Sequence, residues 1–291
     1  MLMKKIKFNS IFSFIIASAT ILSSCAGKVE SEKKVVHNDN KYKDKKIVKE
    51  AVSYNGMLLR LADVSLKKDK EVVLEAIGNA ADAFVFADNS LKNDRLFVLE
   101  CVKKNGVVLA YLDKSFQKDK EIVLEAVKDN GWALEYADES FKKDREFVLK
   151  VVKCSRYPIK FADEALKKDR EIVLYSVRLD GRSLPYVHKS MLKDKEVVLE
   201  AVKNDGWAIQ YADNSLKKDR EIVLESVKSN GWALKFVDKS FTKDGEIVLE
   251  AVKNCRHALQ YADESLKKDR EVVITAIKSD KRAIEFADES L

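Results

Sequence analysis

An aspartate recurs at every 25th position between residues 44 and 269, and no copy contains an insertion or deletion. The ten residues are Asp44, Asp69, Asp94, Asp119, Asp144, Asp169, Asp194, Asp219, Asp244 and Asp269. A valine stands four positions after each aspartate, from Val48 to Val273. A fixed period in this range is typical of solenoid proteins, in which each unit buries its apolar face only against its neighbours. The chain is therefore expected to form a linear array without a single central core.

One copy, residues 119–143, shows how the unit is built. Ile122, Val123, Ala126 and Val127 have the spacing of the buried face of a helix. Asp119 stands at the expected N-cap of that helix, where its carboxylate can accept an early backbone N–H.

The rest of the copy predicts a turn and a second helix. Gly131 lies where the first helix should end, at a C′ position that favours a positive φ. A shorter second helix then places Ala133, Leu134, Tyr136 and Ala137 inward, and Phe141 closes the unit. The fold class is therefore all-α, and residues 44–291 are predicted to form an α-solenoid of ten 25-residue two-helix repeats.

The first 43 residues lie outside this period. A basic start at residues 4–7 precedes an apolar run at residues 11–22 and then Leu22-Ser23-Ser24-Cys25. The run is shorter than the roughly 20 apolar residues of a membrane-spanning helix and has the layout of a secretory signal. The segment before Cys25 resembles the lipobox of bacterial lipoproteins, which implies cleavage before this cysteine and attachment of lipid, palmitate included, to it. Residues 1–24 are then a signal peptide, and residues 25–43 are the lipidated cysteine and a polar tether. The alternatives are a signal peptide with a chance cysteine and an uncleaved anchor.

The charge of the chain changes when the signal is subtracted. The full sequence has 54 basic and 48 acidic residues, but residues 44–291 alone have 46 and 45. The array is therefore close to neutral, which argues against nucleic acid as a partner.

The sequence offers little that predicts an active site. Helix capping accounts for the ten aspartates, whereas a calcium loop needs closely clustered oxygen ligands. Glu121 and Glu125 recur in most copies beside lysines, as on a solvated helix face. The three histidines, His37, His188 and His257, recur in no catalytic order, and the four cysteines have no metal-ligand spacing. We therefore expect neither an enzyme nor a bound cofactor or metal.

One position differs in chemistry from copy to copy, the residue that follows the turn glycine. A core position would not accept Asp, Arg and Trp alike, so we expect it to be exposed and to line up along one edge of the array. Trp, Tyr and Arg are common at the energetic centres of interfaces. The candidate binding ridge consists of Met57, Trp132, Tyr157, Arg182, Trp207, Trp232, His257 and Arg282; Asp82 and Val107 occupy the same position. The alternative is that each ring only covers its own turn.

Two further places depart from the pattern. Copies five and six, which begin at Asp144 and Asp169, carry Pro158 and Pro185, and this is either drift or a specialised central patch. In copy ten, Ile284, Phe286 and Ala287 have no following helix in this sequence, which predicts fraying or contact with a partner.

The unit KKDREIVLEAVKSNGWALKFVDKSF, at residues 217–241, resembles the repeat of DUF4116, a domain of unknown function. The resemblance covers residues 44–291 and implies a tandem helical repeat without known catalytic residues. Copies two, five, nine and ten depart from the family pattern at the turn glycine, where they carry Ala81, Arg156, Arg256 and Lys281.

These observations lead to a functional hypothesis with alternatives. The first is a lipid-anchored scaffold at the bacterial cell envelope, facing the periplasm or the cell surface, that presents an extended protein- or peptide-binding surface. The second is a glycan-binding module that uses exposed tryptophans, and a passive structural spacer is the third.

Overall fold

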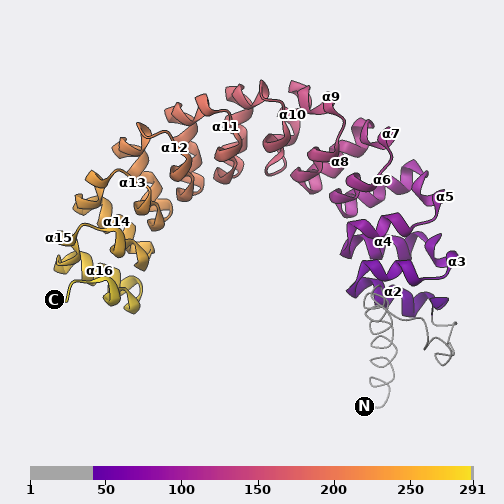
Figure 1. Ribbon diagram of the computed structural model, residues 1–291, viewed down its shortest axis with the longest axis horizontal. Helices are drawn as coiled ribbons and strands as arrows, with labels where there is room; N and C mark the ends of the chain where they lie inside the picture. The colour runs from indigo at the N-terminus through magenta and orange to yellow at the C-terminus, as the bar shows by residue number, and fades with distance from the viewer. Residues whose placement is uncertain (1–41, 290–291) are drawn as a thin grey trace, which may run out of the picture. The chain divides into compact units, whose positions relative to one another are not determined.

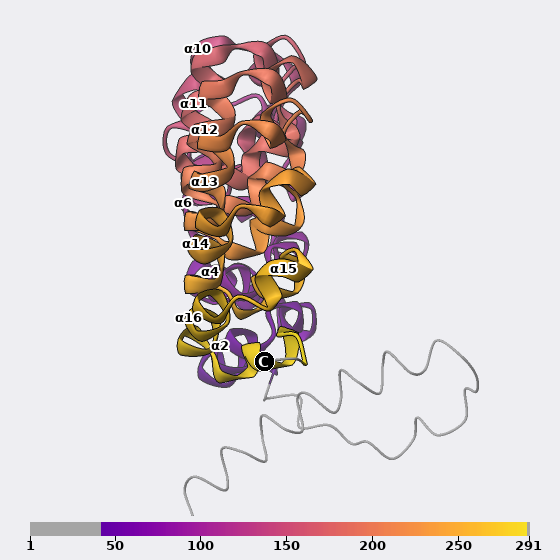
Figure 2. The ribbon, with the colours of Figure 1, turned by 90° about the vertical axis from the view of Figure 1, so that its left-hand side faces the viewer.

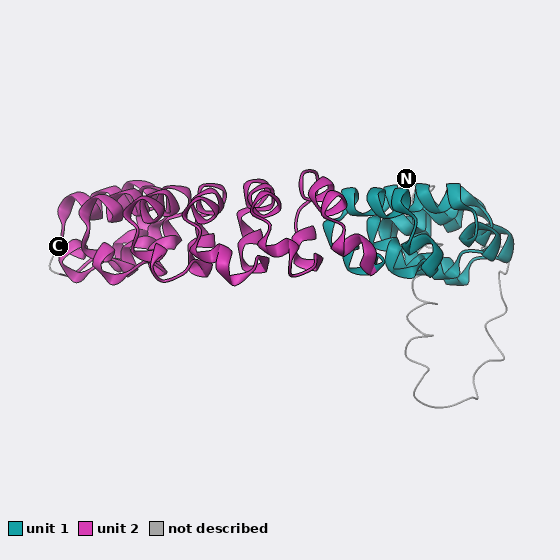
Figure 3. Ribbon diagram, turned by 90° about the horizontal axis from the view of Figure 1, so that it is seen from above, with its two compact units in different colours: residues 1–138 teal, residues 139–291 magenta. Residues whose placement is uncertain are grey.

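The computed structural model describes residues 42–289, and every regular element in this range is a helix (Figure 1). The chain divides into two compact units, Met1–Asp138 and Glu139–Leu291 (Figure 3). The predicted signal peptide, Cys25 and all but the last two residues of the tether lie outside the described residues. No helix within residues 42–289 is both long and apolar enough to cross a membrane.

Each copy contains a long α-helix and a 3-10 helix, and copies one to nine also contain a short third helix, so the predicted all-α repeat fold is confirmed. The second helix of the prediction is a 3-10 helix, and the third segment was not anticipated. In unit 1 the long helices are α2 (Lys45–Tyr54), α4 (Lys70–Asn79), α6 (Arg95–Lys104) and α8 (Lys120–Asp129). The 3-10 helices are η2 (Gly56–Leu61), η3 (Ala81–Phe86), η4 (Gly106–Tyr111) and η5 (Gly131–Tyr136), and the short ones are α3 (Val64–Lys67), α5 (Asn89–Lys92) and α7 (Lys114–Gln117).

Unit 2 repeats this order. Its long helices are α10 (Arg145–Val152), α11 (Arg170–Leu179), α12 (Lys195–Asn204), α13 (Arg220–Ser229), α14 (Gly245–Asn254) and α16 (Arg270–Ser279). The 3-10 row comprises η6 (Pro158–Phe161), η8 (Gly181–Tyr186), η10 (Gly206–Tyr211), η12 (Gly231–Lys235), η14 (Arg256–Tyr261) and η15 (Lys281–Phe286). The short segments are α9 (Glu139–Lys143), η7 (Leu166–Lys168), η9 (Lys189–Lys193), η11 (Leu216–Lys218), η13 (Lys239–Lys243) and α15 (Glu264–Lys267).

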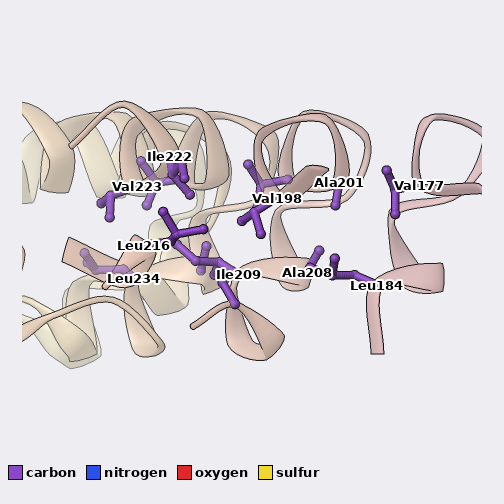
Figure 4. Close-up of a cluster of buried hydrophobic side chains, with 14 of the residues drawn as sticks. Val177, Leu184, Val198, Ala201, Ala208, Ile209, Leu216, Ile222, Val223 and Leu234 are labelled. Atoms are coloured by element: carbon purple, nitrogen blue, oxygen red, sulfur yellow. The ribbon is translucent and has the colours of Figure 1, made fainter. Parts of the chain in front are cut away.

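Within each unit the long helices pack in one row and the 3-10 helices pack in a second row. Figure 2 shows the long helices α10 to α14 and α16 following one another on one side of unit 2. The core lies between the two rows: in Figure 4, Val177, Val198 and Ile222 of the long helices face Leu184 and Ile209 of the 3-10 helices. All five side chains are fully buried.

Aspartate capping of the long helices is confirmed in all ten copies. Asp194 is representative, because its Oδ1 accepts the backbone N–H of Glu196 at 3.0 Å and that of Val197 at 3.2 Å. Each carboxylate thereby satisfies N–H groups that have no partner inside the helix.

The predicted role of the turn glycine is wrong. At Gly56, Gly106, Gly181, Gly206 and Gly231 the backbone does not have a positive φ, and each glycine begins a 3-10 helix. A Cβ atom at any of these positions would lie well inside 3.0 Å of a carbonyl oxygen in the long helix of the following copy. Glycine is present because two backbones approach closely, not because the chain turns through a left-handed conformation.

The predicted inward position of Tyr136 is also wrong. Ala133 and Leu134 are fully buried, whereas Tyr136 is 38% exposed. One equivalent ring in unit 2, that of Tyr261, packs against Trp232 of the preceding copy with the ring planes inclined by 52°. Rings at this position can therefore pack along the surface of the 3-10 row instead of entering the core.

Of the four copies that lack the turn glycine, only copy five changes its turn. There α10 ends two residues early, at Val152, and Tyr157 has a φ of 67°, the one positive value among non-glycine residues 42–289. Pro158 is the first residue of η6, where its missing N–H costs no hydrogen bond. Pro185 lies inside η8, which keeps its six residues.

In copy ten, Ile284 is 55% exposed, although its equivalent Leu259 is fully buried.

Candidate functional site

All ridge residues except Tyr157, which directly precedes η6, occupy the second position of a 3-10 helix, and most of their backbones are held in a common way. In copy seven, Oδ1 of Asp205 accepts the N–H of Trp207 at 3.0 Å, and in copy eight Asn230 does the same for Trp232 at 3.1 Å. Equivalent caps hold Met57, Val107, Trp132, Arg182 and Arg282. The side chain after the glycine is thereby directed to the surface, where its chemistry is free to vary.

The ridge side chains are exposed to different degrees. Trp132 is 40% exposed and Trp207 is 36% exposed. Arg182 and Arg282 are also exposed, whereas Met57, Tyr157, Trp232 and His257 are half-buried. All of them reach solvent.

Three ridge residues of unit 2 form a continuous stack. The ring centroids of Trp207 and Trp232 are 6.1 Å apart with planes inclined by 30°, and those of Trp232 and His257 are 4.9 Å apart with planes inclined by 32°. These values lie in the range of favourable offset aromatic pairs. Consecutive copies therefore join their ridge rings in space, as the alignment of repeats predicts.

A second column of rings, not anticipated from the sequence, completes this surface. Phe236 lies 5.4 Å from Trp207, Tyr261 lies 5.9 Å from Trp232, and Phe286 lies 5.4 Å from His257. Each pairs the ridge ring of one copy with a ring of the next copy. We call these six residues the aromatic ladder: Trp207, Phe236, Trp232, Tyr261, His257 and Phe286. The signal in the sequence was the tyrosine or phenylalanine four positions after most ridge residues.

The aromatic ladder also carries a cation. Nζ of Lys235 lies 5.7 Å from the ring centre of Phe236 and 5.9 Å from that of Tyr261. An ammonium over aromatic faces is attracted by the negative charge of the π system. The ladder is thus an apolar surface with a positive group on it.

Tyr157 and Arg182 form a separate cluster around a buried carboxylate. Asp180 is 3% exposed and accepts hydrogen bonds from Nε and Nη2 of Arg182, both at 3.0 Å. Burial opposes ionisation of Asp180, but the bonds from Arg182 and from the Tyr157 hydroxyl keep its pKa below the ordinary value. The ring of Tyr157 meets that of Tyr186 edge to face at 6.3 Å. This network stabilises the left-handed backbone at Tyr157, a conformation that is unfavourable for a tyrosine.

Arg282 has an equivalent arrangement in the last copy. Its Nε and Nη2 contact Asp280 at 3.1 and 2.9 Å, and Nη1 of Arg256 reaches the same carboxylate at 2.6 Å. These bonds hold the pKa of Asp280 well below its usual range. Both ridge arginines, Arg182 and Arg282, are therefore bound to neighbouring carboxylates.

In unit 1 the ridge is not continuous. Met57 and Trp132 are three copies apart, and Asp82 and Val107 stand between them. The structure therefore brings together the ridge rings of copies seven to nine and leaves the two unit 1 candidates separate.

Other residues that resemble catalytic groups have structural partners. Glu121 receives Nη2 of Arg95 at 2.7 Å, and Glu125 receives Nζ of Lys128 at 2.6 Å. His188 caps a short helix, because its Nδ1 accepts the N–H of Ser190 at 3.2 Å. Cys101 is fully buried, and burial raises the pKa of its thiol to about 12. Within residues 42–289, no group of three or more His, Cys, Asp or Glu is arranged to hold a metal ion.

The comparison with protein families is decisive for the array. The model of DUF4116, a domain of unknown function, matches residues 44–92, 94–142, 144–192, 194–242 and 244–291. The chain belongs to this family. Each stretch that matches the DUF4116 model spans two of the 25-residue copies, so the five stretches cover the ten copies. No curated protein and no solved structure matches the chain.

Proposed function

We propose that this protein is a lipid-anchored scaffold of the bacterial cell envelope whose aromatic ladder binds a protein or peptide. The observation that carries the proposal is the stack of Trp207, Trp232 and His257, which runs through three consecutive copies on the surface. Large aromatic side chains contribute much of the binding energy at protein interfaces. A row of them that spans several repeats suits an extended ligand.

The packing of the rings favours a protein over a glycan. A sugar ring stacks on the open face of a tryptophan, but Trp232 has Trp207 and His257 as ring neighbours in the copies before and after it. Phe236 and Tyr261 add further ring contacts to the two tryptophans. The ladder combines these packed rings with the ammonium of Lys235, and this combination suits apolar and polar groups of a polypeptide.

The proposed membrane attachment rests on the sequence before the array. A basic start, an apolar run and Cys25 occur in the order of a lipoprotein signal. Two lipid chains on one cysteine would give stable anchoring, whereas a single chain binds membranes only marginally. The polar residues between Cys25 and the array would then separate the ladder from the lipid surface.

Site-specific photo-crosslinking of the full chain in the producing cells tests the binding proposal. A benzophenone amino acid replaces Trp207 or Trp232, and the matched control places it at Lys228, which is exposed on the long helix of copy eight. We expect protease-sensitive adducts from the two ladder positions and none from residue 228. Adducts that resist protease but yield to glycosidases would favour the glycan alternative. Absence of adducts at both ladder positions would favour a passive spacer and contradict the proposal.

A further inference from the structure

Four long helices, α8, α12, α13 and α14, carry the same pair of opposite charges on their outer face. A glutamate and a lysine three residues apart form ion pairs, as Glu125 and Lys128 do at 2.6 Å and Glu225 and Lys228 do at 3.2 Å. Such pairs leave the outer face of the long helices neutral where they occur. This pattern provides a reference against which copies five and six can be compared.

Copies five and six replace three polar positions of this face. Lys150 and Tyr175 stand where Glu125 and Glu225 stand in other copies. Leu179 replaces the residue that is Asn204 or Asn254 elsewhere. Those asparagines accept the N–H of a turn glycine in the preceding copy, at 2.8 Å in both cases. Copy five has Arg156 in place of that glycine, which removes the need for an amide at residue 179 but does not require an exposed leucine.

The replaced residues form one surface on α10 and α11. Tyr175 and Leu179 lie one helical turn apart, and each is 38% exposed. Nζ of Lys153 lies 4.4 Å from the ring centre of Tyr175. We call this surface, made of Lys150, Lys153, Tyr175 and Leu179, the α10–α11 patch.

The α10–α11 patch has an uncompensated positive charge. Within residues 42–289, neither Lys150 nor Lys153 has a carboxylate within 4.0 Å, whereas the neighbouring Arg178 is bound by Glu200 at 2.7 Å and Glu196 at 3.3 Å. Two lysines beside exposed Tyr and Leu side chains therefore replace the neutral ion pairs of other copies. The α10–α11 patch therefore presents positive charge and exposed apolar side chains side by side.

We propose that the α10–α11 patch binds an acidic segment of a partner protein that also carries a large apolar residue. The lysines attract and orient carboxylates, and complementary charge of this kind increases the rate and specificity of association. Tyr175 supplies the type of side chain that is frequent at the centre of interfaces. The patch has only two large apolar side chains, both largely packed against the protein, so it offers little apolar area for insertion into a lipid surface. It lies on the row of long helices and is separate from the aromatic ladder on the 3-10 row.

Selection of a displayed library of random 16-residue peptides on the full chain tests this proposal. The test variant combines Lys150→Glu, Tyr175→Glu and Leu179→Asn, which are the residues of neighbouring copies and therefore suit the same helix positions. We expect the enriched peptides to be rich in Asp and Glu with at least one aromatic or aliphatic residue. Their affinity should fall at least tenfold in the variant.

Two controls separate this surface from others. Lys228→Ala removes a lysine from the same face in copy eight, and Trp207→Ala alters the aromatic ladder; the selected peptides should bind both variants as they bind the unaltered chain. Circular dichroism of the triple variant checks that the helices remain. Enriched peptides without acidic residues, equal binding to the triple variant, or no enrichment would overturn the proposal. Binding to phosphatidylglycerol vesicles that the triple variant loses, without peptide enrichment, would assign the patch to lipid instead.

Discussion

Substitution of Gly206 by alanine tests the packing between copies. A Cβ atom at Gly206 would lie 2.9 Å from the backbone nitrogen of Asn230 and still closer to the carbonyl oxygen of Ser226. That oxygen already accepts the N–H of Asn230 at 2.8 Å, at the end of α13. Copies seven and eight must therefore separate, or the last turn of α13 must give way.

The expected loss of stability follows from two opposing effects. The oxygen must retreat by about 1 Å to reach ordinary van der Waals contact with the new methyl group. Overpacking of this kind costs about 1–3 kcal/mol, whereas alanine restricts the unfolded chain and returns about 0.4–1 kcal/mol. Ala81 occupies the equivalent position in copy two, so the array can adjust to a methyl group there and the cost should lie in the lower part of this range. We expect a net loss of about 1–2 kcal/mol.

Gly245→Ala is the matched control, because no atom lies within 4 Å of a Cβ at Gly245, the first residue of α14. Alanine should stabilise that helix by up to about 1 kcal/mol. Urea unfolding followed by circular dichroism measures both changes, and hydrogen exchange in α13 localises the first, since arrays need not unfold in a single step. Equal stability of Gly206→Ala and the unaltered chain, or equal losses in the two variants, would refute the close-approach explanation.

Three further predictions concern charged groups and the anchor. Asp194→Asn keeps a capping oxygen but loses the ion pair with Arg170, so it should cost less than about 1 kcal/mol and make urea stability less dependent on salt. Asp269→Asn should leave that dependence unchanged, because Gly245 stands where the preceding copy would supply the basic partner, and identical salt responses would contradict the assignment. Hydrogen bonds lower the pKa of Asp180 in the folded chain from its ordinary 3.8, so its stabilising effect is present above that value and is lost as pH falls through the folded pKa. Asp180→Asn should therefore reduce stability at neutral pH and flatten the loss on acidification, and an unchanged acid transition would count against this. Cys25→Ala should abolish labelling of the protein by an alkyne analogue of palmitate, and persistent labelling would disprove lipidation at this residue.

The sequence predicted the parts of the fold that depend on spacing. Asp119, Ile122 and Val123 locate the start and the buried face of a long helix, since capping and amphipathic periodicity are local properties. The same features recur ten times, which establishes the array. The prediction succeeded because each repeat contacts mainly its neighbours, so local and global requirements coincide.

Contacts between copies could not be predicted from one copy alone. The turn glycine was expected to be required by its own backbone conformation, but at Gly206 the constraint is a carbonyl oxygen of the following copy. Tyr136 was expected to face inward, but it is 38% exposed, and the equivalent Tyr261 packs against Trp232 of the preceding copy. Alignment of the ridge was predicted, whereas the second aromatic column depends on the offset between copies. That offset is a property of the packed rows.

The same offset accounts for aspartate at seven of the ten helix caps, although serine, threonine and asparagine also cap helices well. In these seven the cap carboxylate also pairs with a basic residue at the start of the preceding long helix: Asp69, Asp94, Asp119, Asp169, Asp194, Asp219 and Asp244. Oδ1 of Asp119 accepts the N–H groups of its own helix at 3.0 and 3.2 Å, while its Oδ2 receives Nε of Arg95 in the preceding copy at 2.8 Å. Asp169 and Asp219 have the same arrangement with Arg145 and Lys195. A hydroxyl or an amide could replace the first bond but not the second, since only a carboxylate carries the charge. At these seven helices the capping residue thus also joins the helix to the previous copy, and this double requirement accounts for an aspartate where the intrahelical bond alone would permit several residues.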